Sequence, residues 1–444
     1  SNERARQLGK LLDVGKLQPV IVVDIPGERE IVVEHADGSR RTIGWQGLQW
    51  ASPYVSVDRR GKEPKRATDI VSLGDVVRIT YVENEKDDKG KLHSYWRLAQ
   101  IPKAQGALVS LEPHTGAIVA LAGGYDFFHS KFNRVTQASR QPGSGIKGFI
   151  YSAALSAGFQ PSSIINDAPV VIEDVTLDSG VWKPSNSNHK FSGPTPLRQG
   201  LAFSKNLISI RLLRSIGIEY ALEHMTRFGF DRNKLPSGLA LALGSAEVTP
   251  MMMARGYSVF ANGGYLINPY QIVRIEQEGV GTIYQAKPLR ACEVCPADVQ
   301  APRTVSAENR YLIYSMMKDV INMGTGKDAK VLGRKDLAGK TGTTNDYKDA
   351  WFNGYNESLV AVAWVGLDNS LTLGRKEFGG RAALPAWIDY MRVALDGVAE
   401  TEPQQPEGVV HNGSDFEDVT VEAIFNPEVL DVLDEKPQAE DDLF

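Results

Sequence analysis

The first hundred residues alternate short apolar runs with polar turn segments. The runs are rich in β-branched and aromatic side chains and lie at 20–23, 31–33, 42–45, 76–82 and 94–98. Turn-forming and charged residues separate them, as in Ala36-Asp-Gly-Ser39. About five strands without helical periodicity predict a small all-β domain, a barrel or a sandwich, over residues 19–104.

The following region mixes strand and helix patterns. Apolar runs on either side of a Pro- and Gly-containing turn predict a hairpin over 107–121. Apolar residues at spacings of three and four over 146–154 predict a helix with one buried face. Similar patterns predict helices at 207–216 and 311–321, and a strand buried on both faces at 358–366. We therefore expect a larger α+β domain over residues 105–400.

The two ends of the chain differ from both of these regions. Residues 1–18 begin with a polar, charged segment that lacks the apolar core of a signal peptide, and we expect them to be a linker remnant. Residues 401–444 are rich in Pro, Glu and Asp, which predicts a solvated acidic C-terminal tail. A short apolar group within that tail, 419–425, is a candidate for local docking.

The composition is that of an ordinary globular protein. With 42% hydrophobic and 23% charged residues, the chain has enough apolar side chains to fill several cores, which excludes a wholly disordered protein. The formal net charge of −5 is too small to argue for steering of a polyanion. The richest apolar stretch, 106–124, is interrupted by Glu112-Pro-His-Thr115, so we expect no membrane-spanning helix within the chain.

The predicted β domain fits the five-stranded OB type, whose members often bind single-stranded nucleic acid. They do so with aromatic side chains in a basic groove. Here the basic residues gather only at Arg59-Arg-Gly-Lys62 and Lys65-Arg66, in a loop that contains Pro64. We therefore expect a protein partner or a spacer role for this domain, and no nucleic-acid partner.

Metal and cofactor chemistry has little support in the sequence. Cys292 and Cys295 are close together, but they lack the further ligands that a structural zinc site needs. A loop disulfide and two free thiols both remain open for them. The seven histidines are scattered and no Gly-x-Ser-x-Gly elbow is present. We expect neither a metal nor a cofactor.

The first candidate for chemistry is Ser144-Gly-Ile-Lys147. If a helix starts at Ser144, the lysine lies on the same face as the serine, one turn later. A serine hydroxyl becomes a useful nucleophile when a base takes its proton, and a lysine kept neutral by burial and a helix dipole is such a base. The same spacing at Ser187–Lys190 and Ser315–Lys318 is more simply explained as coincidence on a surface or helix face.

The second candidate is Ser204-Lys-Asn206. A second hydroxyl near the lysine could pass a proton to a leaving amine, and the Asn206 amide could orient a substrate amide. The competing interpretation of Ser204 is an ordinary helix N-cap, for which serine is a preferred residue.

The third candidate is Lys340-Thr-Gly-Thr343. Gly342 would let a ligand approach the backbone of an edge strand, and the Thr343 N–H could pair with that of Ser144 as an oxyanion hole. Lys340, Thr341 and Thr343 together would receive a carboxylate. An ordinary Gly-containing turn is equally consistent with the pattern. Gly324-Thr-Gly-Lys327 is no phosphate loop, because Asp328 occupies the position that needs Ser or Thr.

In this order, the three motifs resemble those of penicillin-binding transpeptidases and the related serine β-lactamases. The longer segments 133–144, 243–250, 340–352 and 379–387 are similar to a class A high-molecular-mass penicillin-binding protein. The β domain before them resembles the insertion domain of the Gram-negative penicillin-binding protein 1a branch. The resemblance implies a transpeptidase domain with an antiparallel sheet flanked by helices.

The resemblance also implies roles for the motif residues. Ser144 would be the acylated nucleophile and Lys147 its base, while Ser204, helped by Lys340, would shuttle the proton. Asn206 would position the substrate amide. The substrate-binding residues would be Thr341, Gly342 and Thr343. The family's partners are peptidoglycan stem peptides, as a D-Ala-D-Ala donor and a diamino acceptor, and β-lactam inhibitors.

Two departures from the family pattern qualify the resemblance. Gly148 follows the lysine where many relatives have proline, and the family's membrane helix and glycosyltransferase domain are not present. We therefore expect a periplasmic fragment of a protein anchored at the inner membrane through another region. A serine β-lactamase and a non-catalytic β-lactam sensor are the alternative functions.

Overall fold

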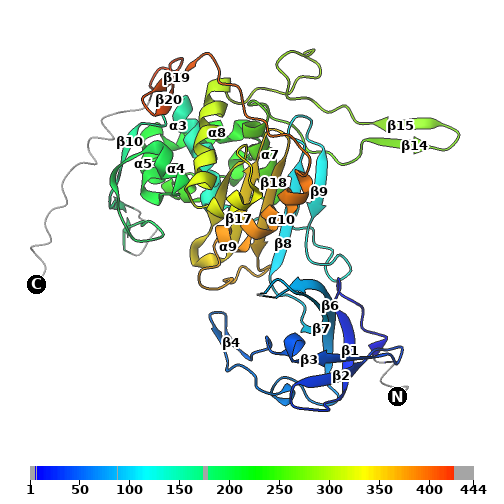
Figure 1. Cartoon of the computed structure of the whole chain (residues 1–444). Helices are drawn as coiled ribbons and strands as arrows, with labels where there is room; N and C mark the ends of the chain where they lie inside the picture. The colour runs from blue at the N-terminus through cyan, green and yellow to red at the C-terminus, as the bar shows by residue number, and fades with distance from the viewer. Residues whose placement is uncertain (1–5, 7, 88, 174–178, 425–444) are drawn as a thin grey trace, which may run out of the picture. The chain divides into compact units, whose positions relative to one another are not determined.

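The structure, a computed structural model, describes residues 6, 8–87, 89–173 and 179–424 (Figure 1). The chain divides into two compact units. The first consists of Ser1–Gln105 together with Gly124–Phe132 and Thr372–Arg375. The second consists of Gly106–Gly123, Asn133–Leu371 and Lys376–Phe444.

The first unit is built on a five-stranded antiparallel sheet with the order β3-β2-β1-β6-β7. The strands are β1 (Gln18–Asp24), β2 (Glu30–Glu34), β3 (Arg40–Gly44), β6 (Val76–Lys86) and β7 (Leu92–Ala99). Alternating side chains such as Val20, Val22, Ile31 and Val33 fill one core. The predicted strands are confirmed, except that the run 42–45 stops at Gly44 because the short helix α2 (Trp45–Leu48) begins there.

Shorter elements complete this unit. They are the hairpin of β4 (Tyr54–Ser56) and β5 (Arg59–Arg60) and the 3₁₀ turn η1 (Ala67–Asp69).

The second unit is organised around a five-stranded sheet with the order β16-β17-β18-β8-β9. The strands are β8 (Gln105–Leu111), β9 (Ile118–Ala122), β16 (Ala338–Thr343), β17 (Asp349–Tyr355) and β18 (Val360–Gly366). β17 is buried along its whole length and β18 along nearly all of it, which confirms the strand predicted to be covered on both faces. β16 is an edge strand of this sheet.

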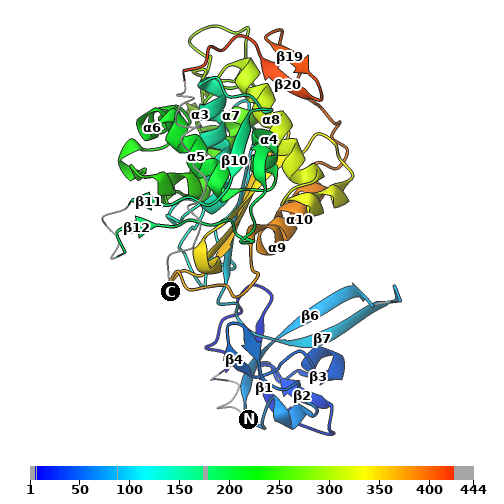
Figure 2. The ribbon, with the colours of Figure 1, turned by 90° about the vertical axis from the view of Figure 1, so that its left-hand side faces the viewer.

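Helices pack on both sides of the sheet (Figure 2). They are α3 (Lys147–Ser156), α4 (Leu197–Ala202), α5 (Asn206–Ile216), α6 (Ile218–Arg227), α7 (Pro250–Ala261), α8 (Ala307–Asn322), α9 (Gly379–Ala382) and α10 (Leu384–Ala394). Figure 2 shows α9 and α10 on one side of the sheet and α3, α5, α6 and α7 on the other. The α+β class predicted from the sequence is therefore confirmed.

Short strands and turns connect these helices. They are β10 (Ile164–Asp167) with β13 (Gly193–Pro196), β11 (Ile172–Glu173) with β12 (Val181–Trp182), β14 (Arg274–Gln277) with β15 (Gly281–Gln285), and the 3₁₀ turns η2 (Gly143–Ile146), η3 (Arg232–Lys234), η4 (Leu239–Leu243), η5 (Lys327–Leu332) and η6 (Asn345–Tyr347).

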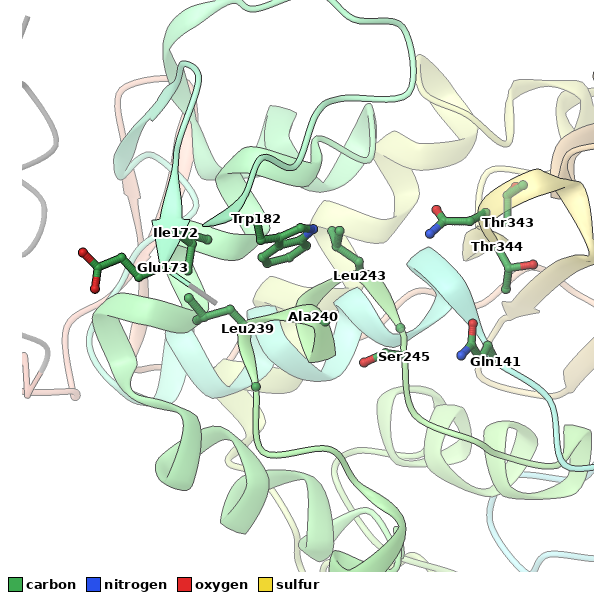
Figure 3. A pocket seen from close by; sticks show the side chains of 13 residues that line it. Gln141, Ile172, Glu173, Trp182, Leu239, Ala240, Leu243, Ser245, Thr343 and Thr344 are labelled. Atoms are coloured by element: carbon green, nitrogen blue, oxygen red, sulfur yellow. The ribbon is translucent and has the colours of Figure 1, made fainter. Parts of the chain in front are cut away.

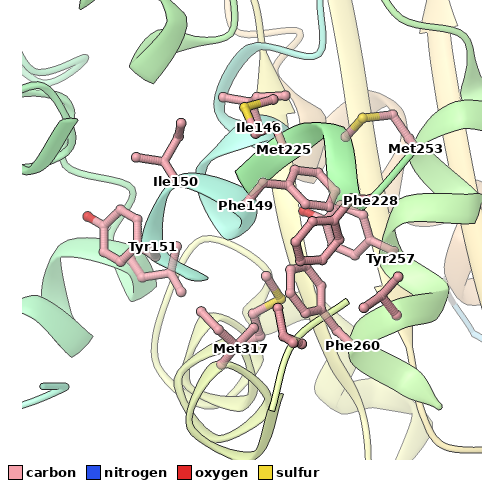
Figure 4. Close-up of a cluster of buried hydrophobic side chains, with 14 of the residues drawn as sticks. Ile146, Phe149, Ile150, Tyr151, Met225, Phe228, Met253, Tyr257, Phe260 and Met317 are labelled. Atoms are coloured by element: carbon pink, nitrogen blue, oxygen red, sulfur yellow. The ribbon is translucent and has the colours of Figure 1, made fainter. Parts of the chain in front are cut away.

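The helix α3 lies at the centre of the second unit. The sequence predicts one buried face, and this is wrong: every residue from Lys147 to Leu155 is buried. The reason is that α3 packs against helices on several sides, including α5, α6 and α8. Around Phe149, the rings of Phe228, Phe230, Tyr257 and Phe260 lie at centroid distances of 4.8 to 5.4 Å (Figure 4).

The segment after residue 400 does not begin as a solvated tail. β19 (Val409–Asn412) and β20 (Asp415–Asp418) form a hairpin whose Val409 and Asp418 are buried. Arg198 of α4 binds Asp415 on this hairpin and Asp319 on α8. The Ile424 N–H donates to the Ala157 carbonyl at the end of α3, so local docking also occurs. Residues 425–444 of the predicted tail lie outside the described residues.

Two smaller expectations can be compared with the structure. Cys292 and Cys295 form a disulfide, which decides between the two interpretations left open for them. Among the residues that the structure describes, no helix is both long enough and apolar enough to cross a membrane.

The ion pairs of Arg198 with Asp415 and Asp319 predict how a substitution changes the stability of the fold. Arg198 and Asp415 are only 16% and 14% exposed, so Asp415→Asn should remove a partly buried charge partner. We expect the free energy of unfolding to fall by about 1–3 kcal/mol, because Asp319 still binds the guanidinium. Urea unfolding followed by tryptophan fluorescence measures the change. Asp389→Asn, in a surface pair with Arg392, is the control. An equal effect of both variants would contradict a stabilising role of the Arg198–Asp415 ion pair.

Candidate active site

Ser144 lies in the 3₁₀ turn η2, directly before α3, and lines a cavity of about 760 Å³. The α-helix starts at Lys147 and not at Ser144 as predicted, although the serine and the lysine remain one turn apart. The turn packs closely against β16. Gly143 has a φ of +52°, and a Cβ there would lie 2.3 Å from the Thr343 carbonyl oxygen. Only glycine allows this approach of the turn that carries Ser144 to the strand.

The Lys147 side chain is completely buried below this turn. Its Nζ donates to the Ser204 carbonyl oxygen and to Asn206 Oδ1, both at 2.8 Å. Burial lowers the pKa of Lys147 well below its ordinary value, and the charge of Lys340 lowers it further. A neutral amine has two N–H groups and one lone pair. The two short hydrogen bonds use the N–H groups, so the lone pair is left to accept a proton.

The Ser204 hydroxyl lies between two lysines. Its Oγ is 2.9 Å from Lys340 Nζ and 3.4 Å from Lys147 Nζ. Ser204 has a φ of +56°, a left-handed conformation that is uncommon for residues other than glycine. The alternative interpretation of Ser204 as a helix N-cap is not what the structure has, because the N-cap of α5 is Lys205.

The Lys340 side chain is also completely buried. Burial lowers the pKa of Lys340 to about 7, so near neutral pH it is present in both protonation states. Its Nζ also donates to the Thr341 carbonyl at 3.1 Å. The hydroxyl of Ser204 is thus connected to one lysine that favours the neutral form and to another that is half protonated near pH 7.

The edge strand β16 forms one wall of the cavity. Thr341 and Thr343 line it, and the Thr341 hydroxyl is 2.6 Å from the hydroxyl of Thr325. Gly342 lies against the turn that carries Ser144, since a Cβ there would be 2.3 Å from the Pro142 carbonyl oxygen. The backbone of β16, Ser144 and the Asn206 amide therefore border the same space. All the residues predicted from the three motifs are brought together.

Several residues of the site were missed by sequence reasoning. Asn186 is buried, and its Oδ1 accepts from the Asn206 N–H at 2.9 Å, while its Nδ2 donates to Asp167 at 2.7 Å. Asp167 also binds Lys205 at 2.8 Å. These residues hold the start of α5 and so the Asn206 side chain. They lie apart in the sequence, and no local spacing signal marks them.

The coincidental motifs are separated from the site's chemistry. The Ser315 hydroxyl accepts from Arg198, and Lys318 pairs with Glu402, so this pair has a structural role. Ser187 lines the cavity, but Lys190 is exposed on its loop. The 324–327 segment, excluded as a phosphate loop, nevertheless supplies Thr325 to the cavity.

The sequence matches two known protein families. Residues 106–374 match the penicillin binding protein transpeptidase domain, and residues 1–104 match the penicillin-binding protein OB-like domain. Penicillin-binding protein 1A of Pseudomonas aeruginosa is 43% identical and is covered over 53% of its length by 91% of this chain. For the same-named protein of Neisseria meningitidis serogroup A the identity is 41%, with 93% of this chain and 49% of the relative covered. The chain thus spans about half the length of these relatives.

Solved structures agree with this assignment. Penicillin-binding protein 1A from Haemophilus influenzae superimposes with a TM-score of 0.83 and 34% sequence identity, over 95% of this chain and 65% of that one. PonA1 from Mycobacterium tuberculosis, at 22% identity and a TM-score of 0.57 over 71% of this chain and 87% of that one, shares the fold. The chain belongs to the penicillin-binding protein transpeptidase family and carries an OB-like domain before its transpeptidase domain.

Proposed function

We propose that the chain is a serine D,D-transpeptidase that cross-links peptidoglycan stem peptides and is acylated by β-lactams. The observation that carries this proposal is the Ser204 hydroxyl between the buried amines of Lys147 and Lys340, in a cavity that Ser204 lines together with Ser144 and the edge strand β16. The donor is a peptide ending in D-Ala-D-Ala and the acceptor is a stem amine. We place the activity at the periplasmic face of the inner membrane, where peptidoglycan is assembled.

In the first half-reaction Ser144 attacks the carbonyl of the penultimate D-alanine. Lys147 takes the hydroxyl proton on its lone pair, and the Ser144 and Thr343 N–H groups receive the developing oxyanion. The peptide bond then breaks, and the leaving amine needs a proton. The Ser204 hydroxyl passes one on from the lysines, because it lies within 3.4 Å of both amines. D-Alanine leaves and an acyl-enzyme remains.

In the second half-reaction an amine of a neighbouring stem attacks the acyl-enzyme. Lys147 takes the amine's proton, and the ester bond to Ser144 breaks with return of a proton to its oxygen. Earlier, in the first half-reaction, the Thr341 and Thr343 hydroxyls, with Lys340 in its charged form, bind the donor's terminal carboxylate, which then leaves with D-alanine. Asn206 keeps one amide N–H for the substrate, since the other donates to the Ser185 carbonyl.

A serine β-lactamase is the competing function, and it needs a base that activates water on the acyl-enzyme. Among the described residues, the hydrogen-bond partners of the Lys147 amine and the Ser204 hydroxyl include no carboxylate. The cavity-lining acids Asp328 and Asp346 are both exposed to solvent. This arrangement favours a long-lived acyl-enzyme over rapid hydrolysis.

The nucleophile can be tested by intact-protein mass spectrometry after incubation with benzylpenicillin. We expect one added drug mass that maps to Ser144, and no added mass for Ser144→Ala. Ser315→Ala, which changes a coincidental serine-lysine pair, should label like the unmodified protein. Labelling that persists in Ser144→Ala would refute the proposal, and rapid loss of the added mass would indicate the β-lactamase.

The two buried lysines predict a bell-shaped pH profile for acylation. The rate should fall at acidic pH as Lys147 gains a proton, and fall again above about 7 as Lys340 loses one. Lys340→Gln should remove the alkaline limb. It should also move the acidic limb to higher pH, because the charge of Lys340 helps to lower the pKa of Lys147. Stopped-flow acylation between pH 4 and 10 measures both limbs, and an acidic limb unmoved by Lys340→Gln would contradict the assignment.

The hydrogen bond between Asn186 and the Asn206 N–H predicts that Asn186 positions Asn206. Asn186→Ala removes the hydrogen bonds that hold Asn206, and we expect acylation to slow by about ten- to a hundredfold. The exposed neighbour Asn188, changed to Ala, is the matched control and should stay within about twofold. Equal rates for the two variants would show that Asn206 is held without Asn186.

A further inference from the structure

Two separate segments supply the N–H groups that receive the oxyanion in the proposed reaction. The Ser144 N–H belongs to the turn η2, and the Thr343 N–H belongs to the last residue of β16. β16 is held by its ladder with β17, in which Thr343 pairs with Ala350. The segment before the turn is anchored elsewhere, at Arg140, whose N–H and carbonyl exchange hydrogen bonds of 2.9 Å with Val248. The separation of the two N–H groups therefore depends on the contacts that join the turn to the sheet.

The Arg140 side chain makes one of these contacts, with the first residue of β17. Its Nε donates to Asp349 Oδ1 at 2.6 Å, and its Nη1 donates to the Ser370 hydroxyl at 2.8 Å. The guanidinium also lies 5.4 Å from the centroid of the Trp364 ring of β18. The side chains of Arg140 and Asp349 are only 8% and 7% exposed, so the two residues form a buried ion pair.

Asp349 extends the connection to the end of β16. Its Oδ2 accepts from the Thr344 hydroxyl at 3.4 Å, and its N–H donates to the same hydroxyl oxygen at 2.9 Å. The Thr344 N–H in turn donates to the Asp349 carbonyl at 3.1 Å. Gln141, which follows Arg140, and Thr344, which follows Thr343, line one cavity of about 520 Å³ (Figure 3). The ion pair thus joins the two segments close to both N–H groups.

A second hydrogen bond runs between the same two segments. The indole Nε1 of Trp351 on β17 donates to the Gln141 carbonyl at 2.9 Å, and Trp351 is completely buried. Both connections start on β17 and end on neighbouring residues of the segment before Ser144. Two contacts side by side fix the orientation of this segment as well as its distance from the sheet.

The ion pair is not explained by stability. Buried ion pairs often add none relative to apolar side chains of similar volume. The Nη2 of Arg140 is also buried, and it has no hydrogen-bond partner among the described residues. An unpaired buried donor destabilises a fold. In contrast, N–H groups that stabilise an oxyanion must be held in place before the reaction begins.

We propose that Arg140 and Asp349 are positioning residues for the two oxyanion N–H groups, an inference that rests on the proposed function. Neither residue is among those that line the catalytic cavity in the described part of the chain. Arg140 holds the segment that carries Ser144, and Asp349 holds the end of β16. Without the ion pair the two N–H groups move apart, and a displacement of about 1 Å is enough to slow a reaction about a hundredfold.

The first test is the kinetics of Ser144 acylation by benzylpenicillin in the full chain. Arg140→Met should lower the limiting rate constant about ten- to a hundredfold. The drug concentration at half of this rate should change by less than about threefold, because the groups that bind the drug before reaction are unaltered. Arg140→Lys keeps a charge beside Asp349 and should recover part of the loss. Intact-protein mass spectrometry should show complete final labelling, whereas a merely structural role would lower the labelled fraction at an unchanged rate constant.

A second probe reports the oxyanion site itself. Phenylboronic acid adds reversibly to a serine oxygen and places a boronate oxygen where the oxyanion forms, so its affinity depends on the same N–H groups. Arg140→Met should weaken this affinity by about the factor by which it slows acylation. Competition with benzylpenicillin labelling measures it.

Two further variants keep the test decisive. Arg140→Met combined with Asp349→Asn leaves no unpaired charge in the interior and so protects the fold. Since the two residues act as one unit, the double variant should be no slower than the slower single variant. Arg310→Met is the matched control, because Arg310 is also buried, pairs with Glu357 and lies over the Tyr314 ring. It should reduce stability but leave the acylation rate constant within about twofold.

The outcomes separate the two proposals. An unchanged rate constant in the double variant, an equal loss in Arg310→Met, or slower acylation with unchanged boronic acid affinity overturns the positioning role while the proposed function stands. If the unmodified protein is not acylated at Ser144, the proposed function itself fails, and the positioning role fails with it.

Discussion

Two completely buried lysines beside one serine hydroxyl are the constraint on which the second unit depends. Removing an ammonium group from water costs several kcal/mol even after relaxation. Among the described residues no carboxylate forms a hydrogen bond with either amine, and the cost is met by lowered pKa values of Lys147 and Lys340. The two nearest acceptors of the Lys147 amine are a carbonyl and an amide oxygen, which orient it without restoring its charge. A nearby carboxylate would have raised the pKa of Lys147 and favoured its charged form.

This constraint explains why α3 is buried on every side. Lys147 is excluded from solvent because the helix that carries it is enclosed by α5, α6, α8 and the rings around Phe149. The Tyr257 hydroxyl donates to the Gly145 carbonyl at 2.8 Å and holds the turn that presents Ser144. The left-handed backbone of Ser204 is a local strain of about 1–3 kcal/mol, which the surrounding hydrogen bonds offset.

Contacts between distant parts of the chain maintain this arrangement. Arg198 connects the helix before Ser204 to α8 and to the C-terminal hairpin. On the other side of Ser204, Asp167 and Asn186 hold the beginning of α5. The short loop with Ser204 and Asn206 is thus fixed at both ends by residues that are remote in sequence. This rigidity keeps the Ser204 hydroxyl at a fixed position between the amines of Lys147 and Lys340 and close to Ser144.

The sequence by itself determined the types of element, the order of the domains and the three motifs. Each of these depends on residues close together in the sequence: the β-branched runs in β1 and β6, the three-residue spacing of Ser144 and Lys147, and Gly342 between two threonines. Only the tertiary structure decided that α3 has no exposed face, that the chain after 400 docks on the core, and that Asn186 and Thr325 join the site. The spacing of residues along the chain does not predict these features, because burial and hydrogen-bond partners depend on which distant segments pack together in three dimensions.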